Sequence, residues 1–266
     1  MKHVAKKRFG QNFLVDKYII TKIVDEINPS DGDNIVEIGP GLGALSLPII
    51  DRVGKINVIE IDRDIIKFLK ENIAKDKINI YSGDALKFDF SIFESKFRLI
   101  GNLPYNISTP LLFHILQRVD LIKDIHFMLQ KEVVDRICAK PNTKAYGKLS
   151  IMLQLKTDCY HLIDVGSNSF HPAPKVDSAI IRMVPKSIND VIIVNENILN
   201  QIVTNAFNQR RKTILNSLSA FLKLDDFEYL VIDYKKRAEN LTMAEYVNIT
   251  NYIESRYNNV GRKFTR

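Results

Sequence analysis

Four consecutive residues, Asn102-Leu103-Pro104-Tyr105, bring hydrogen-bond acceptors and an aromatic ring together directly after an apolar run. The Asn102 amide oxygen and the Leu103 backbone carbonyl can each accept a hydrogen bond, whereas Pro104 donates none and stiffens the turn. Together they suit a planar group that carries an exocyclic NH2, such as adenine. Acceptors on both amine hydrogens favour sp3 character at the nitrogen and turn its lone pair toward an electrophile, such as a sulfonium methyl. The alternative is an ordinary turn in which Tyr105 is only packed.

A glycine-rich loop, Gly39-Pro40-Gly41-Leu42-Gly43, follows the β-branched run 34–38. Glycines let the backbone turn sharply and approach a ligand closely, and the helix that follows would point its N-terminal amides at that ligand. Glu60 ends the next apolar run, where an acid can accept hydrogen bonds from ribose hydroxyls, and Asp84 follows the third run. The spacing Glu-x-Gly-x-Gly-x-Gly differs from the dinucleotide-binding pattern, so a pyrophosphate is not the favoured ligand. A tight turn without a ligand is the alternative.

These residues need a scaffold that aligns the ends of several strands, and the apolar pattern predicts one. Strands are expected at 34–38, 55–61, 78–82, 97–100 and 124–129, with two further apolar runs at 159–165 and 176–184. Helices are expected at 14–27, 42–50, 63–73, 109–119, after the fifth strand through 138, and 148–156. Alternation of strands and helices indicates a mostly parallel sheet covered on both faces, the α/β class.

After Pro185 the strand pattern stops. Helices are expected at 195–207, 210–221, 227–232 and 242–256. The sequence therefore predicts an α/β domain over residues 1–186 and a small all-helical domain over residues 187–266.

Composition excludes several classes of protein. The 266 residues are 45% apolar and 26% charged, which is typical of globular proteins. Two cysteines, Cys138 and Cys159, are too few for a disulfide framework or a Cys-based zinc site. No apolar run is long enough to span a bilayer, and no apolar segment after the basic N-terminus indicates a signal peptide. We therefore expect a cytoplasmic protein.

The net charge of +7 hints weakly at a polyanionic partner. The charge gathers in three runs, Lys6-Lys7-Arg8, Arg210-Arg211-Lys212 and Lys235-Lys236-Arg237. Contacts of such runs to phosphates position an RNA without reading its sequence. The alternatives are solvated helix faces or, for Arg210 to Lys212, structural salt bridges to the first domain.

The glycine loop and its two acids resemble motif I and the neighbouring motifs of class I S-adenosylmethionine methyltransferases. The resemblance implies a Rossmann-like domain in which Gly39 and Gly41 back onto the methionine moiety, Glu60 holds the ribose and Asp84 meets the adenine amine. The Asn102 turn resembles the Asn/Asp-Pro-Pro-Tyr motif of amino-group methyltransferases. A base within RNA must be extruded to reach such a site, and Tyr105 and Phe170 are candidate stacking platforms. The alternative for Phe170 is a hydrophobic plug under its loop.

Five segments together, 7–14, the glycine loop, 102–106, 129–134 and 205–213, resemble the small-subunit rRNA adenine N6,N6-dimethyltransferase family over nearly the whole chain. The resemblance implies S-adenosylmethionine as cofactor, contacts to it from Asn12 and Leu14, and no metal. It implies methylation of two adjacent adenosines in a hairpin loop near the 3′ end of 16S rRNA, within the small ribosomal subunit. We also expect a role in small-subunit biogenesis, no membrane association and a monomer.

Three alternatives remain open. Large-subunit antibiotic-resistance dimethylases have similar sites, but the 205–213 block favours the small-subunit branch. A DNA adenine methyltransferase would need base-reading elements that the sequence does not indicate. A non-catalytic RNA-binding or assembly factor would not need the acceptors at Asn102 beside a cofactor loop.

Overall fold

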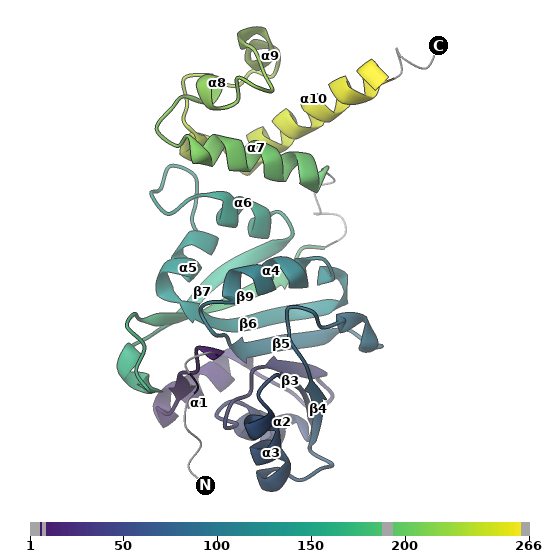
Figure 1. Ribbon diagram of the computed structural model, residues 1–266, viewed down its shortest axis with the longest axis vertical. Coiled ribbons are helices and arrows are strands. Elements are labelled where there is room, and N and C mark those ends of the chain that lie inside the picture. The colour runs from purple at the N-terminus through teal and green to yellow at the C-terminus, as the bar shows by residue number, and fades with distance from the viewer. Residues whose placement is uncertain (1–5, 7–8, 188–193, 262–266) are drawn as a thin grey trace. The chain divides into compact units, whose positions relative to one another are not determined.

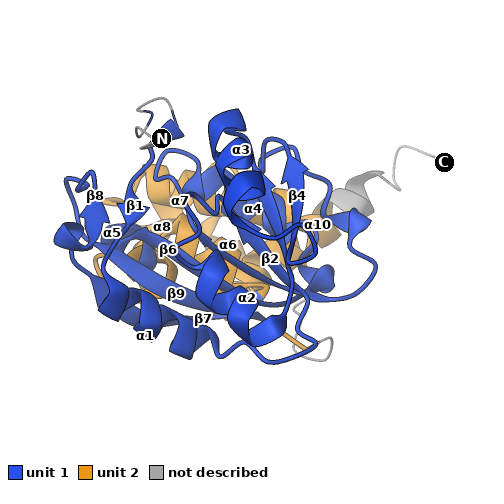
Figure 2. Cartoon of the chain, turned by 90° about the horizontal axis from the view of Figure 1, so that it is seen from below, with its two compact units in different colours: residues 1–134, 157–185 blue, residues 135–156, 186–266 orange. Residues whose placement is uncertain are grey.

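The computed structural model describes residues 6, 9–187 and 194–261 (Figure 1). The chain folds as two compact units (Figure 2). Unit 1 comprises residues 1–134 and 157–185, and unit 2 comprises residues 135–156 and 186–266. The second unit thus resumes at the predicted domain boundary, but it also takes in 135–156, which the sequence places in the first domain.

Local packing explains why residues 135–156 belong to unit 2. Helix α6 (Lys148–Gln154) packs against α7 (Glu196–Asn208). The Lys148 ammonium donates to Thr204 Oγ1 at 2.9 Å. The Tyr146 ring meets the Phe207 ring edge-on, with 6.3 Å between their centroids. These contacts join segments about fifty residues apart, which hydrophobic periodicity along the chain does not reveal.

Unit 1 is built on one seven-stranded sheet in the order β4-β3-β2-β5-β6-β9-β7, which confirms the predicted mostly parallel α/β fold. The strands are β2 (Ile35–Ile38), β3 (Ile56–Glu60), β4 (Ile78–Ser82), β5 (Phe97–Asn102), β6 (Ile122–Gln130), β7 (Thr157–Val165) and β9 (Ser178–Pro185). The pairs from β4 to β6 are parallel, and β9 runs antiparallel to both of its neighbours. The chain order reverses between β2 and β5, so the carboxyl ends of these strands open a crevice where ligands bind in such sheets.

Most helices of unit 1 begin and end within a few residues of the predicted ones, and two of them begin after an aspartate that caps the helix. They are α1 (Lys17–Ile27), α2 (Ser46–Val53), α3 (Arg63–Asn72) and α4 (Ser108–Leu116), and α5 (Lys131–Ile137) runs from unit 1 into unit 2 after Val134. Asp16 caps α1 by accepting from the Tyr18 and Ile19 amides. With the right-handed crossovers that parallel strands follow, this strand order puts α2 and α3 on one face of the sheet and α4 on the other.

Helix α2 begins at Ser46, four residues later than predicted. The three loop glycines have positive φ, 66° at Gly39, 56° at Gly41 and 86° at Gly43. A helix requires negative φ, so it can start only after Gly43. The delay leaves an irregular loop between β2 and α2.

A two-stranded sheet brings the N-terminal segment to a distant loop. Strand β1 (Phe13–Leu14) pairs antiparallel with β8 (Phe170–His171). The Val15 amide also donates to the Ser169 carbonyl at 2.9 Å. The pairing closes more than 150 residues of sequence, and two-residue strands carry no periodic signal that would predict it.

Unit 2 is helical, as expected, but one predicted helix is largely absent. Its further helices are α8 (Ile214–Ser217), α9 (Leu224–Tyr229) and α10 (Met243–Gly261), and α7 packs on α10. The helix predicted over 210–221 is wrong except for the four residues of α8. There the Ile214 and Leu215 amides donate to the Lys236 and Tyr234 carbonyls, and Thr213 bridges Arg237, so a crossing segment replaces the intrahelical partners.

Short 3-10 turns complete the two units at η2 (Phe90–Ile92), η3 (Val119–Leu121), η4 (Ser167–Ser169) and η5 (Ala238–Asn240). Among the helices that the structure describes, none combines the length and the apolar character needed to cross a lipid bilayer.

Candidate active site

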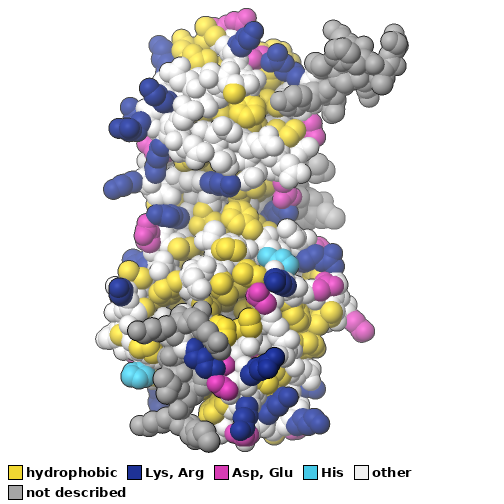
Figure 3. All heavy atoms as spheres, viewed as in Figure 1, with side chains coloured by type: hydrophobic (Ala, Val, Ile, Leu, Met, Phe, Trp, Pro, Cys, Tyr) yellow, Lys and Arg dark blue, Asp and Glu magenta, His cyan; other side chains and the backbone are white. Residues whose placement is uncertain are grey.

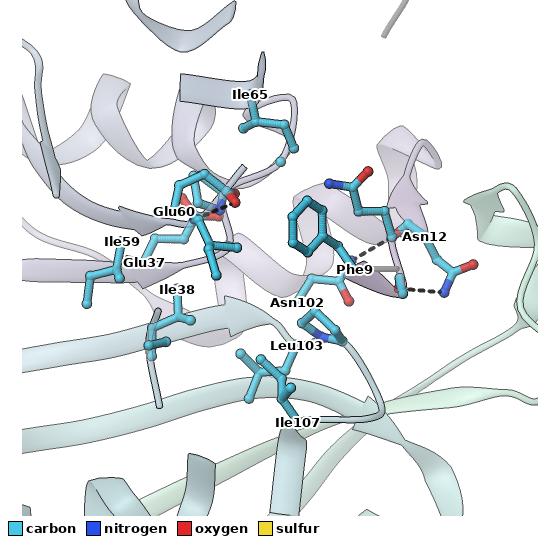
Figure 4. A pocket seen from close by; sticks show the side chains of 18 of the residues that line it. Phe9, Asn12, Glu37, Ile38, Ile59, Glu60, Ile65, Asn102, Leu103 and Ile107 are labelled. Atoms are coloured by element: carbon cyan, nitrogen blue, oxygen red, sulfur yellow. Dashed lines mark hydrogen bonds between the residues drawn. The ribbon is translucent and has the colours of Figure 1, made fainter. Parts of the chain in front are cut away.

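A cavity of about 430 Å³ lies in unit 1 at the carboxyl ends of β2, β3 and β5. This volume falls within the range of small-molecule sites. Figure 4 shows side chains around it that include Glu37 of β2 and Glu60 of β3. Four further segments contribute to its lining. These segments are the N-terminal residues 9–15, the glycine loop, residues 83–86 after β4, and residues 102–107 after β5.

The glycine loop forms one wall and lets the N-terminal segment come close. A Cβ atom placed on Gly41 would lie 3.1 Å from the Phe13 ring, which is tighter than an ordinary contact. Gly101 plays a similar part behind the cavity, because its Cβ would lie 2.6 Å from the Ile38 carbonyl oxygen. A Cβ on Gly39, also in the wall, would lie 4.0 Å from the Asn102 carbonyl oxygen, an ordinary contact distance. The loop therefore gives a ligand access to backbone groups.

Glu60 ends β3 with its carboxylate in the cavity wall (Figure 4). Its Oε1 accepts the backbone N–H of Ile61 and of Asp62, each at 2.8 Å. Burial raises the pKa of this carboxyl above its usual value, and these amides and that of Gly41 oppose the rise. The side chain is thus held in one orientation before a ligand arrives.

Glu37 is a second buried acid of the wall that the sequence analysis did not single out. Its side chain accepts the Ser46 hydroxyl at 2.5 Å, and the residue is 2% exposed. Burial raises the pKa of Glu37 to about 7, and the charge of Glu60 adds to the rise. The first position of the Glu-x-Gly-x-Gly-x-Gly spacing was the signal that could have identified it.

Asp84 lies in the wall after β4, where its Oδ1 accepts the Leu86 amide at 3.0 Å. With Glu37 and Glu60 it makes the charged lining entirely acidic, since none of the described lining residues is Lys, Arg or His. Such a lining suits a cationic ligand and disfavours a pyrophosphate. The residues present therefore fit a sulfonium cofactor with an amino-acid ammonium group.

Asn102 lies at the end of β5 with its amide orientation determined by the N-terminal segment. Its Nδ2 donates to the Asn12 backbone carbonyl at 3.0 Å (Figure 4). Because a carbonyl only accepts, the amide nitrogen must face Asn12 and Oδ1 must face the other way. Asn102 lines the cavity, and its Oδ1 is thereby left as a hydrogen-bond acceptor. Leu103 is anchored by its amide, which donates to the Met128 carbonyl at 3.2 Å.

Tyr105 also lines the cavity, with its ring held from behind. Its hydroxyl lies 2.8 Å from the Oγ of Ser178, which is fully buried at the start of β9. Burial raises the pKa of this phenol, so the ring is neutral at physiological pH. A fixed, half-buried ring at the cavity is compatible with a stacking role.

The structure places Asn12 and Leu14 in the cavity wall but does not bring Phe170 there. Phe170 is 5% exposed and belongs to the same buried hydrophobic cluster as Leu14, its partner across the β1–β8 pair. A base cannot stack on a ring that other side chains cover. The prediction of Phe170 as a stacking platform is therefore corrected to its alternative, a hydrophobic plug.

A second, basic cavity of about 400 Å³ lies in unit 2. It is lined by Asn142, Thr143, Lys144, Arg210, Arg211, Arg237 and Glu239. Arg210 is engaged structurally, since it donates to the Glu239 carboxylate and to the Lys144 carbonyl. This salt bridge lies within unit 2 and not toward the first domain.

Arg211 and Lys212, by contrast, are exposed. Basic residues from other parts of the sequence lie beside them. Lys144 and Arg237 come from other segments and line the same cavity. Arg237 belongs to the third basic run of the sequence, whereas Lys144 was not predicted as a site residue. Figure 3 shows Lys and Arg side chains over much of the visible face of unit 2, with acidic side chains among them. Because its lining is mostly basic, this cavity suits phosphate.

Within the described part of the chain, no group of three His, Cys, Asp or Glu could hold a metal ion.

A family model described as "Ribosomal RNA adenine dimethylase" matches residues 2–255 of the chain. Curated relatives include the Ribosomal RNA small subunit methyltransferase A of Methylobacillus flagellatus, which is 51% identical over 95% of this chain and 99% of its own length. The protein of the same name from Psychromonas ingrahamii is 52% identical over 94% of each chain.

Solved structures are similar across both units. A dimethyladenosine transferase from Plasmodium falciparum superposes with a TM-score of 0.78 at 26% identity, covering 91% of this chain and 98% of its own. The 23S rRNA methyltransferase ErmE superposes with a TM-score of 0.71 at 21% identity, covering 91% of this chain and all of its own. The latter similarity concerns the fold alone.

Proposed function

The chain belongs to the ribosomal RNA adenine dimethylase family, and from that premise we propose that it transfers methyl groups from S-adenosylmethionine to the N6 amine of adenosine in small-subunit ribosomal RNA. The resemblance drawn from the motifs is thereby confirmed, and the chain is a methyltransferase. The names of its bacterial relatives specify the small subunit, which favours that substrate over large-subunit RNA. We further propose that two adjacent adenosines in a hairpin loop near the 3′ end of 16S rRNA become N6,N6-dimethyladenosines.

The observation that carries this proposal is that an acid-lined cavity ends at the turn that begins with Asn102. When bound, the cofactor supplies a methyl group on a positively charged sulfonium, which is an electrophile. Glu60 would accept the ribose hydroxyls, and Asp84 would accept the adenine amine of the cofactor. Glu37, Gly39 and Gly41 border the end where the methionine moiety would lie, and Asn12 and Leu14 would cover it. The methyl group would then lie near Asn102.

The residues after β5 would prepare the substrate amine. Asn102 Oδ1 and the Leu103 carbonyl would accept the two N6 hydrogens and turn the nitrogen lone pair toward the methyl group. Each transfer replaces one N–H by N–CH3 and releases one proton to solvent. Asn102 cannot hold that proton, so its contribution is orientation and electrostatic stabilisation.

Tyr105 would receive the extruded adenine. Stacking of a base on an aromatic ring stabilises it by about 1–3 kcal/mol, which offsets part of the cost of unstacking it from RNA. The Ser178 contact behind the phenol holds the ring in place at the cavity. Pro104 has no backbone N–H to donate, and its ring stiffens the turn beside Tyr105.

In unit 2, Arg211 and Lys212 would contact RNA phosphates, with Lys144 and Arg237 around the same cavity. Arg210 would support them, because its own side chain is bound to Glu239. Such contacts position the substrate particle and leave the choice of base to unit 1.

The test is incubation of the protein and labelled S-adenosylmethionine with small subunits that lack this modification, followed by mapping of the labelled nucleosides. We expect label on two adjacent adenosines as N6,N6-dimethyladenosine. Label confined to other bases, or to large-subunit RNA, would contradict the proposed substrate.

A further inference from the structure

Residues 9–14, which we call the strap, line the cofactor cavity from the N-terminal side. One end of the strap is held by the β1–β8 pair and by the bond from Asn102 to the Asn12 carbonyl. The other end is held at a different place, on the loop between β3 and α3. There the Asp62 carboxylate accepts hydrogen bonds from the side chains of Lys6 and Gln11.

The Asp62 carboxylate is 1% exposed and binds two side chains from the N-terminal segment. The Lys6 ammonium donates to its Oδ1 at 2.6 Å, and Gln11 Nε2 donates to its Oδ2 at 3.0 Å. Gln11 in turn accepts the Lys6 backbone amide at 2.8 Å. Lys6 also reaches the exposed Asp64 at 2.5 Å. Lys6 and Gln11 therefore act on the strap as one unit.

Asp62 also contacts Glu60, the acid proposed to bind the ribose of the cofactor. The Asp62 backbone N–H donates to Glu60 Oε1 at 2.8 Å, and the Asp62 side chain caps α3 by accepting the Asp64 amide at 3.0 Å. A shift of Asp62 would thus move one of the hydrogen bonds that orient Glu60. Asp62 therefore both holds the strap and helps to orient Glu60.

We propose that Asp62 is a positioning residue that fastens the strap over the bound cofactor through Lys6 and Gln11, so that the Lys6–Asp62 pair limits the rate at which S-adenosylmethionine leaves. The identity of the ligand rests on the proposed function. Residues 9–14 form one wall of the cavity, so widening that wall requires the strap to move.

The charge of Asp62 can be stabilised with the strap either closed or open. Burial alone would raise the pKa of Asp62, but the bonds from Lys6 and Gln11 and the Asp64 amide outweigh it and lower the pKa below its usual value. A buried carboxylate needs such partners, whereas one exposed by an open strap is stabilised by water. The charge is satisfied in both states, so the strap can open without leaving Asp62 unpaired.

The experiment compares cofactor dissociation from the full-length protein and four variants by surface plasmon resonance with S-adenosylmethionine. The variants are Lys6→Gln, Asp62→Asn, the double variant, and Lys67→Gln as control. Asn is a good helix N-cap, so Asp62→Asn keeps the α3 cap. Lys67 is an exposed lysine of α3 whose removal changes net charge equally without touching the strap.

We expect each single variant to dissociate about ten-fold faster, the size expected for losing one charge-assisted hydrogen bond. The double variant should be no faster than Asp62→Asn alone, because that variant has already removed the Lys6–Asp62 pair. Lys67→Gln should match the wild type. Hydrogen exchange of the cofactor-bound protein should rise in residues 9–14 and stay unchanged in α1, which general destabilisation would not produce.

Unchanged dissociation in both single variants, or additive effects in the double variant, would overturn the role of the pair. If Asp62→Asn failed to fold, Lys6→Gln would still decide the matter, because Lys6 is partly exposed and caps no helix. A wild-type protein that did not bind S-adenosylmethionine would contradict instead the cofactor assignment on which the proposal rests.

Discussion

At the scale of single residues, the site depends on acids whose surroundings differ. Glu37 and Glu60 are both buried in the same wall, and the charge of Glu60 disfavours that of Glu37. Glu37 has a hydroxyl as partner, whereas Glu60 accepts backbone amides from its own loop. Two carboxylates that repel each other in a wall without cations are stabilised when a cationic ligand arrives.

The first prediction concerns Glu37 and pH. Its pKa is raised to about 7 in the folded protein, above the ordinary value of 4.5, so the folded state binds the proton more tightly than the unfolded state. Its contribution to stability is therefore complete below about pH 4.5 and is lost as pH rises through 7. Glu37→Gln should remove this decline, which amounts to at most about 3 kcal/mol. Denaturant unfolding of cofactor-free protein from pH 5 to 8 measures it.

The matched control is Asp51→Asn, an exposed acid on α2. Its stability should follow the wild-type pH dependence. An unaltered slope in Glu37→Gln would show that the buried carboxyl does not titrate in this range.

The second prediction concerns Glu60. Glu60→Gln should weaken S-adenosylmethionine binding by about ten-fold or more, because an amide can accept from only one side where the carboxylate accepts with both oxygens. The loop N–H groups that now bond Oε1 would keep one acceptor, so folding should be little affected. Isothermal titration calorimetry measures the affinity. Wild-type affinity in this variant would contradict the ribose assignment.

Residue-scale prediction from sequence succeeded where the signal is local. Asn102, Glu60 and the glycines follow strand ends directly, and the parallel sheet brings such ends to one edge. Phe170 was placed wrongly because the exposure of its ring depends on a strand pair with residues 13–14, far away in sequence. Glu37 was missed because a buried acid within an apolar strand reads as part of the strand.

At the scale of elements, β5 is tied to its surroundings by a buried charge network around Arg98. The guanidinium donates to Asp124 on β6 at 2.9 Å and to Asp33 at 2.8 Å, and to the Ile27 carbonyl at the end of α1. These partners hold the amino end of the strand whose carboxyl end carries Asn102.

The third prediction follows from this network. Arg98→Met should lower the free energy of unfolding by about 3–5 kcal/mol, because two largely buried carboxylates lose their shared cation. Urea unfolding measures the change. Arg52→Met, which breaks the more exposed pair with Asp25, is the control and should cost at most about 1 kcal/mol. Equal losses in the two variants would contradict the role of burial.

Elements were predicted well where the hydrophobic period acts alone, and less well where distant backbone groups compete. The strands and α1, α3 and α4 begin and end within a few residues of their predicted bounds. The predicted helix 210–221 is reduced to α8 because backbone amides there find partners in residues 234–237. That competition is set by tertiary packing and leaves no trace in the apolar pattern of the segment.

At the scale of the whole molecule, the net charge of +7 acquires meaning from its placement. The cavity of unit 1 is acidic, whereas that of unit 2 is basic. The excess charge therefore is not spread uniformly, and a cationic small ligand and a polyanion can each find a complementary surface on the same chain. Sequence runs indicated Arg211 and Lys212, but Lys144 joins them only through the fold.

The fourth prediction tests the basic surface. Replacing Arg211 and Lys212 together by Gln should weaken binding to small subunits and lower the slope of log K against log salt by up to about 1.5. Lys67 and Lys70, both exposed on α3, are the matched pair for removing two charges elsewhere. A filter-binding titration at several salt concentrations measures the slope. Equal slopes in the two double variants would return Arg211 and Lys212 to solvated surface charges.

We propose that one cavity binds the cofactor while the turn at Asn102 prepares the amine, and the Asn102→Ala variant tests these two roles separately. S-adenosylmethionine affinity is measured by calorimetry, and single-turnover methyl transfer to under-methylated small subunits is measured with the same protein. We expect the affinity for S-adenosylmethionine to stay within about ten-fold of wild type, because the glycine loop and Glu60 remain, and methyl transfer to fall by at least about a hundred-fold. Methyl transfer at the wild-type rate with Asn102→Ala would contradict this proposal.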